Sequence, residues 1–174
     1  MTTPELITKY ELHAAPSGVH GAAHVRVDRD AFARIATAFV RDEGFPLVLL
    51  VATDDRAAGE GFGVHAVFAN DVAHEHLIVT TALPEDDPRY ESLTKTIMAA
   101  HWYERYACDM FGIAAEGHPD PRRLVHHENI PEGTWPLRKD FAWNTKLDVA
   151  DVPYPMHHVE GDGVYEIPVG PIHA

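Results

Sequence analysis

Between residues 24 and 53 the chain places one helical stripe of apolar residues between two apolar runs of strand length. The stripe recurs at i, i+3, i+4, i+7 and i+8, which predicts a helix with one buried face; its members are Phe32, Ile35, Ala36, Phe39 and Val40. Asp28 or Asp30 can cap the start of this helix, and Gly44-Phe45-Pro46 ends it. A helix of this kind must pack against another element, which favours a sheet beside it.

Three strands are predicted after this helix. Pro46–Thr53 is a continuous apolar run, which predicts a strand covered on both faces. Phe62–Ala69 and His74–Ala82 follow after polar turns, and neighbouring strands of this kind favour an antiparallel meander. The glycines of the first turn (59, 61 and 63) predict a tight hairpin rather than a nucleotide-binding loop. A short strand at His24–Val27 precedes the helix.

A second, longer helix is predicted over residues 94–111, with Ser92 or Thr94 before its start. Trp102, Tyr106 and Met110 lie four apart, so they share one face that we expect to be buried. The order strand, helix, strands, helix predicts an α+β domain over residues 1–112. Its expected architecture is a two-layer, ferredoxin-like sandwich with an antiparallel sheet.

Residues 113–174 have a different texture. Eight of the 13 prolines lie between Pro119 and Pro171, and apolar periodicity disappears. An extended Pro-rich segment cannot bury much surface alone, so we expect this tail to lie against another protein.

The composition limits the partners. The net charge of −13 would repel phosphate backbones, so nucleic-acid binding is not expected. The start of the chain lacks the features of a signal peptide. No apolar run reaches the roughly 20 residues of a membrane-spanning helix, so we expect a soluble chain that meets a membrane only through partner subunits.

Cysteine usage limits the chemistry. Cys108 is the single cysteine, so there is no disulfide framework and a reducing compartment is expected. Because iron–sulfur clusters need about four thiolate ligands, we expect no cluster and no nickel–iron centre in this chain. Beside Asp109, Cys108 is predicted to be a buried or half-buried thiol rather than a nucleophile.

Three sequence blocks lie close together between residues 102 and 141: WYERYACDMFGI, GHPDPRR and PLRKDF. Together they resemble the 30 kDa subunit family of NADH:quinone oxidoreductase, respiratory complex I. They are equally similar to the front domain of large subunits of membrane-bound NiFe hydrogenases of the formate hydrogenlyase and hydrogenase-4 component G type. Two positions depart from the family pattern: Tyr106 replaces a glutamate and Pro121 replaces a leucine.

The resemblance implies an α+β fold and a non-catalytic docking subunit or domain in the peripheral arm of a membrane-bound oxidoreductase. The implied partners are the large (49 kDa-like or hydrogenase large) subunit and an iron–sulfur subunit. Those partners would carry the iron–sulfur clusters and the quinone site or NiFe centre, and would hold this chain at the cytoplasmic side of the inner (plasma) membrane. The isolated chain is then expected to have no activity. Whether the parent complex uses NADH, formate or hydrogen stays open.

The end of the chain carries a second resemblance. GVYEIPVGPIHA, residues 163–174, is similar to the opening of a hydrogenase large-subunit domain. We therefore expect either a fragment of a fused subunit or a separately encoded version of its front domain, and this ending favours the hydrogenase branch.

The predicted partner interface follows the three blocks and this ending. Its residues are Glu104, Arg105, Asp109, Gly112, His118, Pro119, Arg122, Arg123, Leu137, Arg138, Lys139, Asp140, Gly170, Pro171 and His173. Prolines stiffen the backbone before each basic pair, which lowers the entropy cost of binding a partner's carboxylates. Internal pairing of these arginines with Glu104, Asp109 or Asp120 is an equally weighted alternative. Glu104 and Asp109 are expected at the surface, with an i,i+4 pair between Arg105 and Asp109 possible.

Two other functions compete with docking. One is a small metal-dependent enzyme that uses the His-rich segment 118–128, although no zinc-binding spacing supports it. The other is an assembly or regulatory protein with the same fold. No catalytic, cofactor-binding or metal-ligating residue is predicted.

Overall fold

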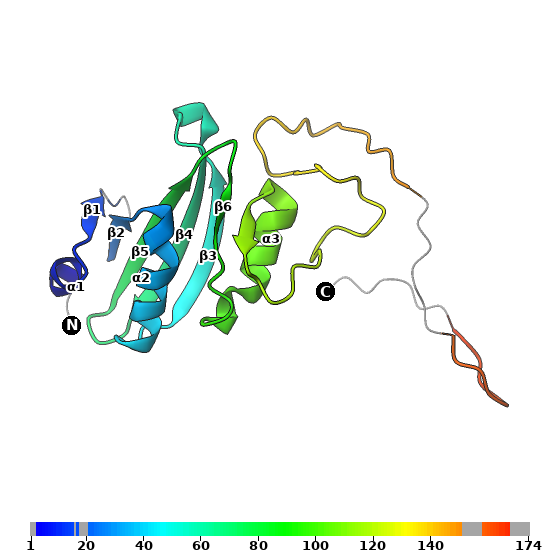
Figure 1. Ribbon diagram of the computed structural model, residues 1–174, viewed down its shortest axis with the longest axis horizontal. Coiled ribbons are helices and arrows are strands. Elements are labelled where there is room, and N and C mark those ends of the chain that lie inside the picture. Colours follow the sequence, from blue (N-terminus) through cyan, green and yellow to red (C-terminus); the bar gives the residue numbers. More distant parts are fainter. Residues whose placement is uncertain (1–2, 16, 18–20, 151–157, 168–174) are drawn as a thin grey trace.

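The computed structural model describes residues 3–15, 17, 21–150 and 158–167 (Figure 1). Its helices are α1 (Thr3–Lys9), α2 (Arg29–Arg41) and α3 (His101–Phe111), with 3-10 turns at Arg56–Ala58 and Met98–Ala100. Its strands are β1 (His13–Ala15), β2 (Ala22–Arg26), β3 (Leu47–Asp54), β4 (Phe62–Asn70), β5 (Glu75–Leu83), β6 (Arg89–Glu91) and β7 (Ala114–Glu116).

The main sheet has the order β1-β2-β5-β4-β3. Strands β3, β4 and β5 form the predicted antiparallel meander, and the α+β class is confirmed. The prediction of an antiparallel sheet is wrong for one pair, because β2 and β5 are parallel. After β2, α2 carries the chain back along the sheet. A meander of three strands then leaves β5 running in the same direction as β2, so the sheet is mixed.

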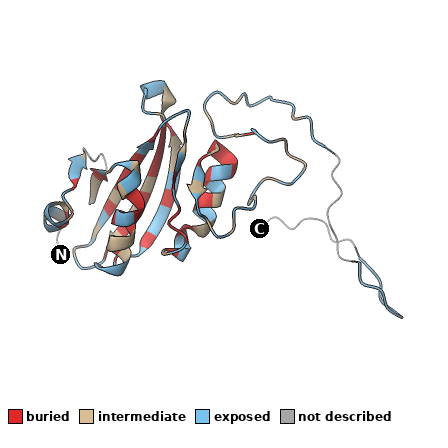
Figure 2. Ribbon diagram, in the orientation of Figure 1, coloured by how far each residue is buried: buried red, intermediate tan, exposed pale blue. Residues whose placement is uncertain are grey.

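The apolar core lies between α2 and one face of the sheet (Figures 1 and 2). Phe32, Ile35 and Phe39 of the predicted stripe are fully or almost fully buried there. The ring centroid of Phe39 lies 5.5 Å from that of Phe68 on β4 and 5.4 Å from that of Tyr10, in edge-to-face geometry. Burial of aromatic side chains is therefore what joins helix to sheet.

Strand β3 differs from its prediction. It is one of the two edge strands of the main sheet, and its apolar side chains are not covered on both faces. Val48, Leu49 and Val51 keep 50%, 38% and 39% of their surface exposed. The continuous apolar run is thus explained by an exposed apolar surface rather than by a second covering layer within the described chain.

The sheet face opposite α2 carries a line of polar side chains. His65 Nδ1 lies 2.8 Å from Thr80 Oγ1, which lies 2.7 Å from His24 Nε2. On its other side, His65 Nε2 lies 2.9 Å from Thr53 Oγ1, which donates to Asp55 at 2.5 Å. Since the neighbours of His65 on β4 point into the core, the line follows from strand alternation. Burial lowers the pKa of His65.

The region around α3 is built differently. Helix α3 begins at His101, seven residues after the predicted start, and lies beside β3 (Figure 1). Strands β6 and β7 pair in parallel, which joins residues 114–116 to the folded part of the chain. Much of the chain after β7 is exposed (Figure 2). Among the described residues, no helix is both long and apolar enough to span a bilayer.

Candidate functional site

The three sequence blocks meet around α3. We call residues 101–113, 117–126 and 134–140 the motif cluster. Four groups of polar contacts organise it. The first is centred on Glu104 and the second on His118. In the third, Asp109 and Arg105 each bind the loop after His118, and in the fourth, Arg138 binds the end of α3 while Asp54 binds the backbone of Lys139. Each joins segments that lie apart in the sequence.

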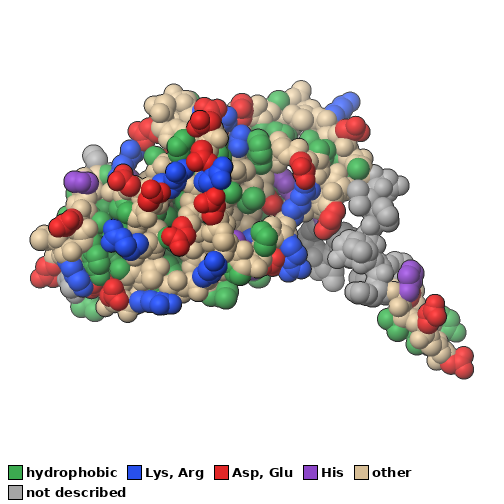
Figure 3. Space-filling view, viewed as in Figure 1, with side chains coloured by type: hydrophobic (Ala, Val, Ile, Leu, Met, Phe, Trp, Pro, Cys, Tyr) green, Lys and Arg blue, Asp and Glu red, His purple; other side chains and the backbone are tan. Residues whose placement is uncertain are grey.

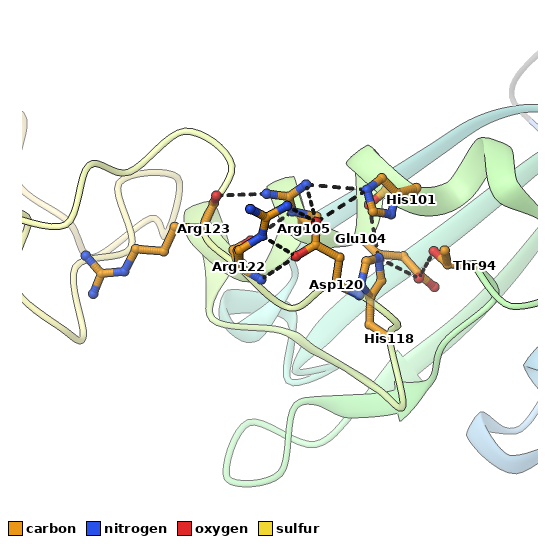
Figure 4. Close-up of polar contacts among 8 residues, drawn as sticks. All are labelled: Thr94, His101, Glu104, Arg105, His118, Asp120, Arg122 and Arg123. Atoms are coloured by element: carbon orange, nitrogen blue, oxygen red, sulfur yellow. Dashed lines mark hydrogen bonds and ion pairs between the residues drawn. The ribbon is translucent and has the colours of Figure 1, made fainter. Parts of the chain in front are cut away.

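Glu104 is 1% exposed, which contradicts its predicted place at the surface. Its carboxylate accepts a hydrogen bond from Thr94 Oγ1 at 2.6 Å (Figure 4). It also accepts from Ser92 Oγ at 2.6 Å and from the Leu93 backbone N–H at 2.7 Å. Ser92 and Thr94 therefore do not cap the helix; their hydroxyls donate to the side chain of Glu104, which lies within α3. This is why residues 92–97 are a loop rather than the first turns of a longer helix. These three donors stabilise the buried carboxylate, which in turn ties the loop to α3.

His118 lies next to this carboxylate, with Nε2 3.7 Å from Glu104 Oε2. The Asp120 backbone N–H donates to His118 Nδ1 at 3.0 Å, so Nδ1 is an acceptor. Nε2 then carries the proton and donates to the His101 carbonyl at 3.2 Å. The imidazole rings of His101 and His118 stack, with their centroids 4.9 Å apart. The GHPD turn is thereby fixed to the start of α3.

Asp109 is also buried, at 7% exposed, and not at the surface as predicted. One of its oxygens accepts three consecutive backbone N–H groups, from Leu124 at 2.9 Å, Val125 at 2.7 Å and His126 at 3.0 Å. Arg105 binds the same loop from the other side. It donates to the Arg122 and Arg123 carbonyls at 2.8 and 2.9 Å. Arg105 and Asp109 thus both bind the loop after His118. The possible i,i+4 ion pair between them is not formed.

The side chains of the two arginines in GHPDPRR, Arg122 and Arg123, bind different partners. Arg123 points away from the cluster in Figure 4 and donates to the carbonyls of His127 at 3.0 Å and Ile130 at 2.7 Å. Arg122 is paired with Asp120 at 2.7 Å, and its side chain is 81% exposed. Asp120 also lies 3.3 Å from Arg105. The Arg122 guanidinium holds the pKa of Asp120 well below its usual range. Of the two arginines, Arg122 is exposed, whereas Arg123 is only partly exposed.

The block PLRKDF packs against the end of α3. Arg138 donates to the Phe111 carbonyl at 2.7 Å and stacks 3.6 Å from the centroid of Trp135. Burial lowers the pKa of Arg138. Gly112 ends α3 with φ +71°, and a Cβ there would lie 2.5 Å from Trp135. Only glycine fits both the left-handed backbone and this close approach.

Asp54 and Arg56 connect this block to the sheet, and no sequence pattern pointed to them. Asp54 accepts the Lys139 backbone N–H at 2.8 Å, and Arg56 lies 2.7 Å from both Asp54 and Asp140. Arg56 holds the pKa of Asp54 well below its ordinary value. The side chains of Lys139 and Leu137 remain exposed. Because 84 residues separate Arg56 from Asp140, no local pattern could reveal the pair.

The aromatic residues of α3 are less buried than predicted. Trp102 is 69% and Tyr106 is 42% exposed, whereas Met110 is buried as expected, and so is Phe111. The buried face of α3 also carries Glu104, Ala107 and Asp109, so its polar anchors displace the large aromatics outward. Cys108 is not fully buried: its surface is exposed in part, and its thiol is partly covered. The pKa of its thiol is raised by partial desolvation and by Asp109.

Trp102 and Tyr106 line a hollow between β3, α3 and the loops that follow α3. We call it the apolar groove; its volume is about 410 Å³. Its lining residues are Leu49, Leu50, Val51, Ala52, Trp102, Tyr103, Tyr106, Ala107, Phe111, Leu124 and Leu137. Of the predicted interface residues that the structure describes, only Leu137 lies in this lining.

The competing hypothesis of a metal-dependent enzyme finds no support in the described part of the chain. Within the described ranges, no group of three or more His, Cys, Asp or Glu side chains is placed to hold a metal ion, including in segment 118–128. Pro119 lies in the turn between His118 and Asp120. Gly170, Pro171 and His173 lie outside the described residues.

Residues 25–146 match the family described as "Respiratory-chain NADH dehydrogenase, 30 Kd subunit". The chain belongs to this family. It is 34% identical over 131 residues to hydrogenase-4 component G of Escherichia coli, covering 73% of this chain and 24% of that protein. It is 35% identical over 127 residues to the NADH-quinone oxidoreductase C subunit of Chloroherpeton thalassium, covering 72% of this chain and 52% of that protein. The chain therefore spans about half or less of the length of these relatives.

Solved structures agree on the fold. A trypsin-resistant fragment of Nqo5 (residues 1–134) superposes with a TM-score of 0.56 at 28% identity, covering 67% of this chain and 94% of that one. A chain of an archaeal membrane-bound sulfane sulfur reductase superposes with a TM-score of 0.65 at 23% identity, covering 81% and 84%. The resemblance inferred from the three sequence blocks is confirmed.

Proposed function

We propose that this chain is a non-catalytic docking subunit or domain in the peripheral arm of a membrane-bound oxidoreductase, and that it binds the large subunit. The observation that carries the proposal is that the charged motif side chains form hydrogen bonds within the protein. Glu104, Asp109 and Arg105 bind the protein's own backbone and hydroxyl groups. Groups occupied in this way are suited to shaping a surface rather than to transferring protons.

The redox chemistry then belongs to the partners. We propose that iron–sulfur clusters, and either a quinone site or a NiFe centre, lie in the companion subunits, and that these hold the chain at the cytoplasmic side of the membrane. Relatives named as parts of NADH-quinone oxidoreductase, hydrogenase-4 and formate hydrogenlyase support this class of assembly. A single cysteine supports the assignment of the clusters to other chains.

The test is co-expression of the chain with its cognate large and iron–sulfur subunits, with an affinity tag on the large subunit. We expect equimolar co-purification and co-elution in size exclusion. The isolated chain should contain no stoichiometric iron, nickel, zinc or flavin by elemental analysis and absorbance. A large subunit that assembles fully without this chain would contradict docking, and turnover by the isolated chain would favour an enzyme instead. Loss of the chain from the mature complex would favour an assembly factor.

A further inference from the structure

The GHPD turn, residues 117–120, depends on an imidazole for its shape. The Asp120 backbone N–H donates to His118 Nδ1 at 3.0 Å, and the side chain of His118 is only 4% exposed. In most turns the acceptor for such an N–H is a carboxylate, amide or hydroxyl oxygen. Here a group that can be protonated near neutral pH takes that place.

Both ring nitrogens of His118 can keep their partners only while the ring is neutral. A backbone N–H can only donate, so Nδ1 has to accept and cannot carry a proton. The single ring proton then lies on Nε2, which donates to the His101 carbonyl at 3.2 Å. A second proton, on Nδ1, would point at the Asp120 N–H and deprive it of its acceptor. The closed turn therefore excludes the proton that an open turn can take up.

The charges around the ring are of both signs. In the described part of the chain, the charged or titratable side chains that lie near His118 are Glu104, His101 and Arg105 on α3, Lys95 before α3, and Asp120 in the turn itself. Glu104, at 3.7 Å from Nε2, would attract a protonated ring, whereas a protonated His101, stacked at 4.9 Å, would repel it. What separates the two forms of the turn is therefore the hydrogen bond at Nδ1.

We propose that His118 is a pH-sensitive switch that closes the GHPD turn when it is neutral and opens it when it is protonated. The inference concerns the chain by itself and does not rest on the proposed docking function. Protons bind the open turn and not the closed one, so the closed turn is favoured at higher pH and is lost as the pH falls. An ordinary histidine becomes mostly protonated between about pH 7 and pH 5.5, which would raise the opening equilibrium roughly tenfold.

Opening the turn would change the charges that GHPDPRR presents to solvent. The carboxylate of Asp120 lies 2.7 Å from Arg122 and 3.3 Å from Arg105, and Figure 4 shows these groups beside His118. Both ion pairs depend on the position that the closed turn gives to Asp120. Acidic and basic side chains are interspersed on the face seen in Figure 3, so moving one carboxylate alters a local pattern of charge.

Hydrogen exchange of the Asp120 amide in the full chain tests the switch. Its protection factor, corrected for the intrinsic exchange rate at each pH, should fall roughly tenfold between about pH 7 and pH 5.5. The amides of β4 and β5 should keep their protection, which distinguishes a local opening from unfolding. The ¹⁵N chemical shifts of the His118 ring should place its proton on Nε2 at pH 7. A protection factor that does not change with pH, or a proton on Nδ1 at pH 7, would overturn the inference.

Three substitutions separate His118 from its neighbours. His118→Asn supplies a carbonyl oxygen that accepts a hydrogen bond and does not titrate, so the Asp120 amide should stay protected at both pH values. His118→Ala removes the acceptor, so the amide should be unprotected at both. His101→Gln should retain the pH dependence of the wild-type chain.

Two results would place the sensor elsewhere and overturn the inference. One is a pH dependence that survives in His118→Asn, and the other is a pH dependence that disappears in His101→Gln. Circular dichroism checks the fold of each variant. If His118→Ala does not fold, the wild-type chain and His118→Asn still decide the outcome.

Discussion

The α2–sheet core and the motif cluster are stabilised by opposite means. Phe39 and Phe68 join helix to sheet through apolar contacts between regular elements. Glu104 and Asp109 instead hold irregular loops by accepting several hydrogen bonds each at buried sites. Apolar burial is non-directional and fixes a fold, whereas charged hydrogen bonds are directional and fix the course of a loop. Substitutions in each region, and at the surface, should therefore differ in the size and in the reach of their effects.

The largest effect is expected in the core. Phe39→Ala removes a fully buried ring that contacts Tyr10, Phe45 and Phe68. It should lower the free energy of unfolding by about 3–5 kcal/mol, since it leaves a cavity as well as losing burial. Urea denaturation followed by circular dichroism measures this. Val72→Ala is the exposed control, and an equal loss there would contradict the assignment of the core.

A smaller and more local effect is expected in the motif cluster. Asp109→Ala leaves three backbone N–H groups without their acceptor and should cost about 2 kcal/mol. Hydrogen exchange should accelerate at Leu124, Val125 and His126, while the β4 and β5 amides stay protected. Asp109→Asn keeps an acceptor oxygen and should lose less. Exchange in Asp109→Ala that is as slow as in the wild-type chain would show that the carboxylate does not hold the loop.

A third prediction concerns pH. Burial lowers the pKa of His65 in the folded state, so as pH falls below the ordinary value of about 6.5 the unfolded state binds a proton that the folded state does not. As far as His65 is concerned, the free energy of unfolding is therefore highest above pH 6.5 and decreases as the pH falls below that value. His65→Gln should reduce the loss of Tm between pH 7 and 5.5, whereas Gln at the exposed His76 should not. An unchanged pH slope would remove His65 as its source.

The smallest effect is expected at Arg122. Its pair with Asp120 is solvent-exposed, and such pairs contribute little. Arg122→Ala should change the free energy of unfolding by less than about 0.5 kcal/mol. Urea denaturation followed by circular dichroism measures this. A loss as large as that of Asp109→Ala would contradict the small contribution expected of this exposed pair.

Much of the fold follows from local periodicity. The stripe of α2 and the β3–β4–β5 meander are predicted directly by the spacing of apolar residues, and the three motif blocks identify the family. The predicted start of α3 is wrong because Ser92 and Thr94 are typical caps in any sequence. Here the carboxylate of Glu104, which lies about one turn inside α3, recruits both hydroxyls.

The α+β class, the family and the single thiol could be known from the amino-acid sequence alone, because they depend on composition and on neighbours within a few residues. Three features required the folded chain: which face of α3 is buried, that β2 and β5 are parallel, and that Asp54 and Arg56 hold the PLRKDF loop. The outward-facing apolar groove is a fourth, since its walls come from β3, α3 and the later loops. A buried polar group is stable only where its partners converge, and those partners come from distant parts of the chain.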